Sequence, residues 1–219
     1  FATPVLKRIL SDYKSDYTND DLLALYTFTG GVPKYIEFFV DKGCTNMESM
    51  VDAMLQPDSI ILSEGRAMLI QELGKKYGNY FSLLAAIASG SNTFPVLEDE
   101  MGKNMGGLLN RLEIDYELVK KKRPIMAKDG AQAVRYEISD LFLRFWFRYF
   151  IKYQRYIEVG NLKSLSDIIK QDYPTYSGQT LEYYFRQQMA ESFDFEDIGS
   201  WWEGKKNSDQ HEIDIVGIY

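Results

Sequence analysis

A carboxylate in the C-terminal part of the sequence lies among apolar residues, which suggests a catalytic or metal-binding role. Residues 211–218 predict a β-strand in which Asp214 stands among the apolar residues Ile213, Ile215 and Ile218. A carboxylate inside an apolar strand costs free energy unless it is paired, hydrogen-bonded or bound to a metal ion. Asp214 is therefore the first candidate for a catalytic or metal-binding residue.

Two further segments are expected to position residues near Asp214. Residues 198–202, with the sequence IGSWW, predict a strand that is followed by a polar turn. Residues 180–193 predict an amphipathic helix that carries Glu182 and Arg186 four positions apart. The helix could bring Glu182 to the carboxylate site, or Glu182 could simply form a surface ion pair with Arg186.

These segments resemble the PD-(D/E)xK nuclease-like domain at the C-terminus of a prokaryotic family of AAA-type ATPases, often called archaeal ATPases. Glu182, IGSWW and the EIDIV segment around Asp214 match the first three parts of that pattern. The fourth part, a strand bearing Glu-x-Lys, does not occur before Tyr219. The resemblance implies hydrolysis of a phosphodiester with Mg²⁺ held by Asp214 and the missing glutamate. With only Glu182 and Asp214 present, we expect weak Mg²⁺ affinity and no nuclease activity.

A glycine–proline turn near the N-terminus is the next candidate site. Residues 22–26 predict a helix that Asn19 or Asp20 could cap, and Gly30 and Gly31 end it. A second helix begins at Val32 and Pro33, where a proline is well tolerated. An ordinary break between two helices accounts for this pattern without any function.

The same turn resembles the GxP motif in the helical lid of AAA-type nucleotide switches. That resemblance implies that Gly31, Val32 and Pro33 face a nucleotide in the whole protein. The sequence contains no G-x-x-x-x-G-K-[ST] motif, so it has no phosphate-binding P-loop. ATP and Mg²⁺ are therefore expected to bind an upstream P-loop domain of the parent protein, and no cofactor is expected to bind this chain tightly.

The middle of the chain predicts a winged helix-turn-helix. A helix that ends at Gly90 is followed by a short helix that Thr93 could cap, and then by a helix in the recognition position with apolar residues at i, i+3, i+4 and i+7. Two strands are expected next, at residues 117–125 and 133–138, and they would form the wing.

Four consecutive cations lie on the first of these strands. Lys120, Lys121, Lys122 and Arg123 stand out because the chain as a whole has a net charge of -7. As an exposed wing they could contact DNA phosphates, and such binding would depend strongly on salt. They could equally belong to a solvated hairpin that faces an acidic patch of the same protein.

Residues 140–156 predict a helix rich in aromatic side chains. Ser139 could cap it, and Arg144 and Arg148 lie on one face, where we expect them to pair with carboxylates. The segment also matches the junction between the winged helix and the nuclease-like domain in the same ATPase family. We predict a structural role, a helix that joins two modules, and the alternative is a stacking platform for nucleic acid. A further short helix is expected to end at Pro174.

The composition limits the classes of protein to which the sequence can belong. The chain has 219 residues, of which 45% are hydrophobic, so it can bury a substantial core. Its one cysteine, Cys44, excludes an internal disulfide, favours a reducing cytoplasm and is expected to be a buried or half-buried hydrophobic residue. The most apolar run, residues 141–151, is too short to span a membrane. The absence of an initiator methionine suggests part of a longer protein.

We therefore predict a mainly α fold with a small β component. It would comprise a helical ATPase lid (residues 1–58), a winged helix (59–139) and a linker helix with the first part of a restriction-endonuclease-like α/β domain (140–219). The predicted function is the regulatory and nucleic-acid-binding portion of a prokaryotic ATPase. The alternative is a winged-helix adaptor that binds another protein. Expected partners are an upstream P-loop domain, duplex DNA, and a second copy paired along an open edge of residues 213–218.

Overall fold

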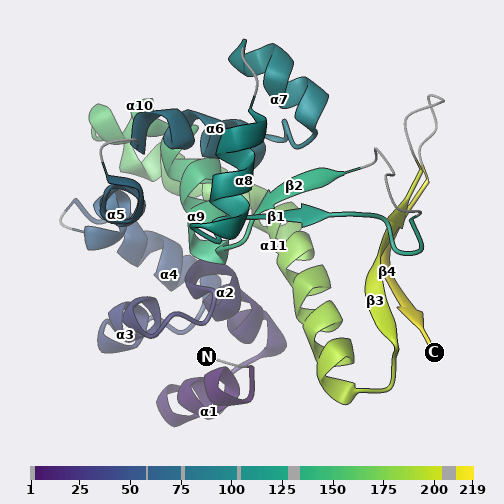
Figure 1. Cartoon of the computed structure of the whole chain (residues 1–219). Coiled ribbons are helices and arrows are strands. Elements are labelled where there is room, and N and C mark those ends of the chain that lie inside the picture. The colour runs from purple at the N-terminus through teal and green to yellow at the C-terminus, as the bar shows by residue number, and fades with distance from the viewer. Residues whose placement is uncertain (1–2, 58, 75–76, 103–104, 128–133, 204–210) are drawn as a thin grey trace. The chain divides into compact units, whose positions relative to one another are not determined.

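The computed structural model describes residues 3–57, 59–74, 77–102, 105–127, 134–203 and 211–219 (Figure 1). In these residues the protein is mainly helical with a small β component, as predicted, and its strands form two small two-stranded antiparallel sheets. Contacts divide it into two compact units. The first comprises Phe1–Phe81 and Asp140–Thr180, and the second comprises Ser82–Ser139 and Leu181–Tyr219. The predicted division into three consecutive segments remains a prediction.

The helices are α1 (Thr3–Tyr13), α2 (Asn19–Thr29), α3 (Pro33–Asp41), α4 (Met47–Met54), α5 (Ile60–Leu73), α6 (Tyr77–Ser89), α7 (Phe94–Met101), α8 (Gly106–Ile114), α9 (Leu141–Phe145), the π-helix η2 (Trp146–Ile151), α10 (Gln154–Glu158) and α11 (Leu162–Ser192). The strands are β1 (Val119–Lys122), β2 (Arg135–Ile138), β3 (Asp197–Trp202) and β4 (Glu212–Ile218). None of the helices in the described ranges is long and apolar enough to cross a membrane.

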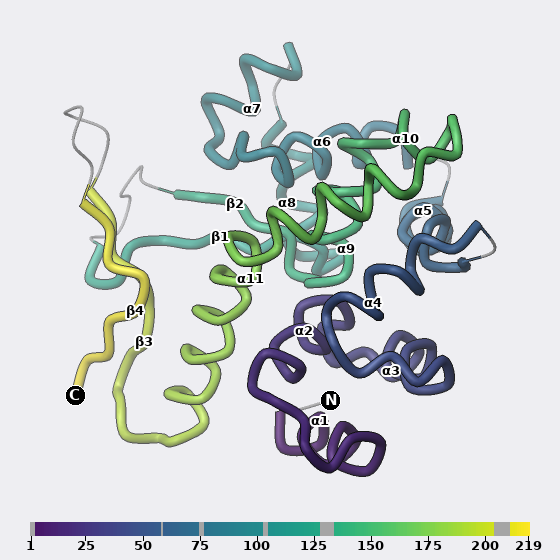
Figure 2. The backbone as a smooth tube through the Cα atoms, turned by 180° about the vertical axis from the view of Figure 1, so that it is seen from behind, coloured from purple at the N-terminus to yellow at the C-terminus, as the bar shows by residue number. Residues whose placement is uncertain are grey.

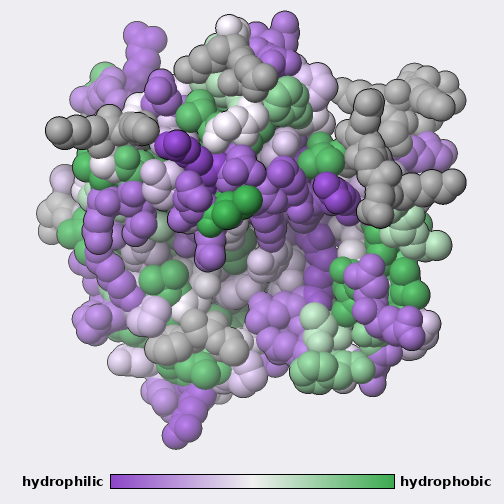
Figure 3. All heavy atoms as spheres, viewed as in Figure 1, coloured by the Kyte–Doolittle hydropathy of each residue, from purple (hydrophilic) through white to green (hydrophobic). Residues whose placement is uncertain are grey.

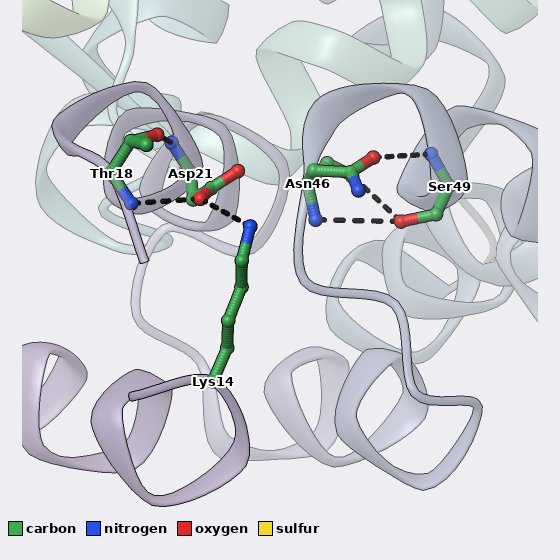
Figure 4. A network of polar contacts seen from close by, with 5 residues as sticks. All are labelled: Lys14, Thr18, Asp21, Asn46 and Ser49. Atoms are coloured by element: carbon green, nitrogen blue, oxygen red, sulfur yellow. Dashed lines mark hydrogen bonds and ion pairs between the residues drawn. The ribbon is translucent and has the colours of Figure 1, made fainter. Parts of the chain in front are cut away.

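In the first unit, the N-terminus of α2 is fixed by a capping box (Figure 4). The hydroxyl of Thr18 accepts a hydrogen bond from the backbone N–H of Asp21, and the Asp21 carboxylate accepts one from the N–H of Thr18. Lys14 adds an ion pair of 2.9 Å to the same carboxylate. The cap is therefore Thr18, and the predicted cap at Asn19 or Asp20 is wrong by one or two positions. A carboxylate at the third position of the first turn can bond back to the cap, and Asp21 holds that position relative to Thr18.

The core of the first unit is built around the aromatic side chains of α9 and η2. Phe145 is fully buried, and its ring centroid lies 5.0 Å from that of Phe28 on α2. Trp146 is also buried, and its indole N–H donates to the carbonyl of Leu62 on α5 at 3.0 Å. The structural interpretation of this segment is thus supported, because its rings fill a core.

The start of this segment differs from prediction. Asp140, and not Ser139, caps α9, because its carboxylate accepts a hydrogen bond from the N–H of Leu143 at 2.7 Å. The predicted pairing of an arginine with a carboxylate is confirmed for Arg148. Its Nε and Nη2 atoms donate to Asp172 at 3.0 and 2.8 Å, and the hydroxyl of Tyr149 donates to the same oxygen at 2.7 Å.

The predicted helix break at Pro174 is wrong, because α11 continues through it (Figure 2). A proline inside a helix removes one backbone hydrogen bond and costs about 3 kcal/mol. Packing on both sides of Pro174 offsets this cost: Tyr173 and Tyr176 are buried, and Asp172 is held by the bonds described above. α11 passes from the first unit to the second after Thr180.

In the second unit, α7 and α8 precede the hairpin of β1 and β2, in the predicted order. Thr93 occupies the cap position of α7, but its side chain makes no capping hydrogen bond, contrary to expectation. The strands pair antiparallel with Val119 opposite Ile138, and the N–H of Leu118 donates to the carbonyl of Leu112, which joins the hairpin to α8. Both strands are shorter than predicted, and the loop between them falls largely outside the described residues.

β3 and β4 form the second hairpin, with Asp197 opposite Ile218 and Trp202 opposite Glu212. The predicted polar turn between these strands falls outside the described residues. In the part of the chain that the structure describes, this sheet has two strands, so β4 presents one edge without a neighbouring strand. Ile213 is 51% exposed, and hydrophobic side chains show at the surface around this hairpin (Figure 3).

Candidate nucleic-acid interface

Two of the predicted wing cations pair with carboxylates of the same unit. Lys121 lies 2.6 Å from Glu113 of α8, and Lys122 lies 2.5 Å from Glu137 on the opposite strand β2. Lys121 is exposed, as an exposed wing predicts, but Lys122 is half-buried, and this burial lowers the pKa of Lys122 although Glu137 opposes the shift. The pairing agrees with the alternative of a hairpin that faces acidic residues of the same protein.

The same strand also lines a groove with a volume of about 320 Å³, together with the second half of α11. Lys120 and Lys122 contribute from β1, and Tyr183 and Arg186 contribute from α11. The ammonium group of Lys120 lies 3.9 Å from the centre of the Tyr183 ring, a cation–π distance. The groove thus gathers three cations in a protein of net negative charge.

Sequence reasoning missed Tyr183 and Arg186 as members of this site. Arg186 was interpreted only as the helical partner of Glu182, yet the two side chains are separated by 4.0 Å, the outer limit of an ion pair. Its closer contact is a hydrogen bond of 2.8 Å that Nη1 donates to the buried hydroxyl of Ser200. The spacing of Tyr183 and Arg186 on one helix face was the available signal.

The hairpin of β1 and β2 is attached to β3 beside the groove. The backbone N–H of Ile125, just beyond β1, donates to the carbonyl of Ser200 at 2.7 Å. A Cβ atom at Gly199 would lie 3.0 Å from the Cβ of Ile125, so the absence of a side chain at Gly199 permits this approach. These contacts hold the cations of β1 next to α11 within the second unit.

The two predicted acidic site residues are close enough to influence each other. Burial raises the pKa of Glu182, and the negative charge of Asp214 raises it further, while Arg186 and Lys122 oppose the rise. Asp214 itself is exposed. The expectation of a carboxylate inside an apolar environment is therefore wrong for Asp214, because water solvates its charge.

Glu182 and Asp214 do not form a complete set of ligands for a divalent metal ion. Across the described ranges, no group of three or more His, Cys, Asp or Glu side chains is placed to hold a metal ion. Mg²⁺ is bound through oxygen atoms, and two carboxylates with Arg186 and Lys122 nearby supply a poor set of ligands. Glu182 and Asp214 remain predicted site residues.

The N-terminal turn is structurally well defined. Gly30 has a φ of +58°, which favours glycine, and a Cβ atom there would lie 3.3 Å from the Cβ of Leu141. Gly31 is buried and donates its N–H to the hydroxyl of Thr29 at 3.1 Å, whereas Val32 is half-buried and Pro33 is exposed. Pro33 begins α3 as predicted. These contacts explain the turn structurally, and the nucleotide-facing role of Gly31, Val32 and Pro33 stays a prediction.

Comparisons with known proteins give two findings. The DUF234 family model, which describes archaeal and bacterial proteins of unknown function, matches residues 146–219. An uncharacterized protein of Methanocaldococcus jannaschii is 27% identical over 210 residues, which cover 91% of this chain and 45% of that protein. The chain therefore spans less than half the length of this curated relative. No solved structure matches.

The chain is thus similar to prokaryotic proteins of unknown function, which agrees with the prokaryotic part of the predicted resemblance. The region matched by the family model contains Glu182, Arg186 and Asp214. Lys120 and Lys122 precede it. The groove therefore combines residues from inside and outside the matched region.

Proposed function

We propose that this chain is the regulatory and nucleic-acid-binding portion of a prokaryotic ATPase. In the whole protein, an upstream P-loop domain would bind ATP and Mg²⁺, and the helices of residues 1–58 would act as its lid. Lid motion would reposition a winged helix that binds duplex DNA and a nuclease-like module that follows it. The proposal rests on the resemblance of GGVP and IGSWW…EIDIV to that ATPase family.

The observation that carries the DNA-binding part is the convergence of cations from β1 and α11. The order of α7, α8, β1 and β2 supports the predicted winged helix, in which α8 would hold the recognition position. Lys120, Lys122 and Arg186 line one groove although acidic residues outnumber basic residues in the chain. Local clustering of this kind is what a net acidic protein needs to contact phosphates.

The first test is the replacement Lys121→Glu. We expect it to weaken binding to duplex DNA and to lower the magnitude of the salt-dependence slope by about one, because one phosphate contact is lost. Stability should fall modestly, because the replacement removes the ion pair with the half-buried Glu113, which contributes about 0–1 kcal/mol, and places a second carboxylate next to it. Fluorescence anisotropy of labelled duplex DNA at several salt concentrations measures both quantities.

The matched control is Lys163→Glu, which makes the same charge change at an exposed position of α11 in the first unit. Equal weakening by the two replacements would indicate a general effect of net charge and would argue against a specific contact at Lys121. A large loss of melting temperature in Lys121→Glu would show that the lysine is structural.

A second test concerns the nuclease-like residues. We expect that the chain does not cut plasmid DNA in the presence of Mg²⁺ or Mn²⁺, because Glu182 and Asp214 alone provide too few ligands. Asp214→Ala should behave in the same way. Cleavage by the original chain and not by Asp214→Ala would contradict the requirement for a Glu-x-Lys strand. Agarose gel electrophoresis, with an active nuclease as control, gives the readout.

The second candidate function is a winged-helix adaptor that binds another protein. The ion pairs of Lys121 with Glu113 and of Lys122 with Glu137 favour it, because they occupy cations that DNA would otherwise use. Binding to a protein partner that does not change with salt, together with no measurable affinity for duplex DNA, would support the adaptor.

A further inference from the structure

The guanidinium group of Arg186 has few hydrogen-bond partners for a cation with so little solvent contact. Its side chain is only 15% exposed. Within the described ranges its contacts are one hydrogen bond to Ser200 Oγ at 2.8 Å and the 4.0 Å approach to Glu182. A guanidinium group has five N–H donors in a rigid planar arrangement. Most of these donors are therefore available at the groove.

The three groove cations are also close enough to repel one another. Burial is the main cause of the lowered pKa of Lys122, and the positive charges of Arg186 and Lys120 lower it further. The carboxylate of Glu137 acts in the opposite direction. An anion that entered the groove would relieve this repulsion and would meet the remaining donors of Arg186.

We propose that the groove formed by Lys120, Lys122, Tyr183 and Arg186 binds a backbone phosphodiester of a nucleic-acid strand. Arg186 donates two parallel hydrogen bonds to the phosphate, and the two lysines act as nearby positive charges. This proposal rests on the proposed nucleic-acid function and deepens it. It places the principal phosphate contact in the groove beside β1, in addition to the surface of the wing.

The charges around the groove favour a phosphodiester over other phosphate groups. Glu137 and Glu182 lie beside the cations, and Asp214 is close enough to affect Glu182. The three cations and the three nearby carboxylates balance in formal charge, so the groove suits an anion with a single negative charge better than one with two or more. A phosphomonoester or a polyphosphate carries more negative charge and would be repelled by the carboxylates.

The test compares Arg186→Gln with Arg155→Gln in the full chain. Arg155 is exposed on α10 of the first unit, so its replacement removes the same charge away from the groove. Fluorescence anisotropy measures the Kd for a labelled mixed-sequence duplex and for the corresponding single strand between about 50 and 200 mM salt. We expect Arg186→Gln to weaken binding at least about tenfold, as loss of a charge-assisted contact does, and Arg155→Gln to leave it unchanged.

Two further measurements keep the test independent of folding. Circular dichroism checks that Arg186→Gln is folded, and Lys120→Gln, which does not remove the Ser200 hydrogen bond, should weaken binding in the same direction. Arg186→Lys should restore only part of the affinity, because an ammonium group cannot form two parallel bonds.

The outcomes separate the two proposals. If the original chain binds DNA and Arg186→Gln binds equally well, the groove proposal fails while the proposed function stands. If the original chain binds no nucleic acid, both the groove and the DNA-binding part of the proposed function fail. Competition by inorganic phosphate or a phosphopeptide at the same concentration as the oligonucleotide would overturn the preference for a phosphodiester.

Discussion

Replacement of Gly65 by alanine should destabilise the protein, although alanine is the better helix former. A Cβ atom on Gly65 in α5 would lie 2.2 Å from Cδ2 of Trp146 and 2.6 Å from its Cγ. The indole cannot move away easily, because Trp146 is only 2% exposed and its N–H is bonded to Leu62. Overpacking of this kind costs about 1–3 kcal/mol. The gain in helix propensity is only about 1 kcal/mol.

We therefore expect a net loss of stability and a melting temperature lowered by several degrees in Gly65→Ala. Gly178→Ala is the matched control, since Gly178 lies inside α11 and a Cβ atom there has no neighbour within 4 Å. Alanine at that position should raise stability by up to about 1 kcal/mol. Thermal unfolding followed by circular dichroism measures both variants. A shift of the same sign in both would show that the indole does not pack against Gly65.

Replacement of Phe145 by alanine should have the largest effect on stability. Phe145 has 0% exposure and makes ring contacts with Phe28, Tyr149, Phe150 and Tyr176. Truncation of a buried phenylalanine to alanine removes apolar contacts and leaves a cavity, at a cost of about 3–5 kcal/mol. Because natural domains are stable by about 5–15 kcal/mol, this loss is a large fraction of the total.

Urea denaturation of Phe145→Ala should show a midpoint far below that of the original chain. Phe193→Ala removes the same side chain from a position that is 91% exposed, and it should change stability by no more than about 0.5 kcal/mol. Phe145→Leu should lie between the two, because leucine fills part of the cavity. A Phe145→Ala variant as stable as Phe193→Ala would mean that these rings do not form the core of the first unit.

The elements that the sequence predicted best are those set by local interactions. Gly30 ends α2 in a left-handed conformation, and Pro33 begins α3, because backbone preferences at these positions act within a few residues. β2 follows from its alternating apolar side chains, and β1, β3 and β4 overlap segments that the sequence predicts as strands. The burial of Cys44 was also expected from its residue type.

The sequence was least reliable where distant residues decide the outcome. Pro174 predicted a helix end by its own chemistry, yet α11 continues because Tyr173, Tyr176 and Asp172 are held by residues of other helices. Distant residues also surround the π-helix that begins at Trp146, because the Trp146 side chain packs on Gly65, which lies far earlier in the chain. Tertiary packing can outweigh a local preference of a few kcal/mol.

In the candidate site, too, the residue types identified some members and the tertiary structure decided which side chains lie together. The residue types alone indicated Lys120, Lys122, Glu182 and Asp214 as candidate site residues. Only the tertiary structure brought Arg186 of α11 beside the lysines of β1, and only it placed Asp214 in contact with solvent. Periodicity specifies which face of a helix or strand a residue occupies, but the neighbours across that face come from other elements, whose approach depends on how side chains far apart in the sequence pack together.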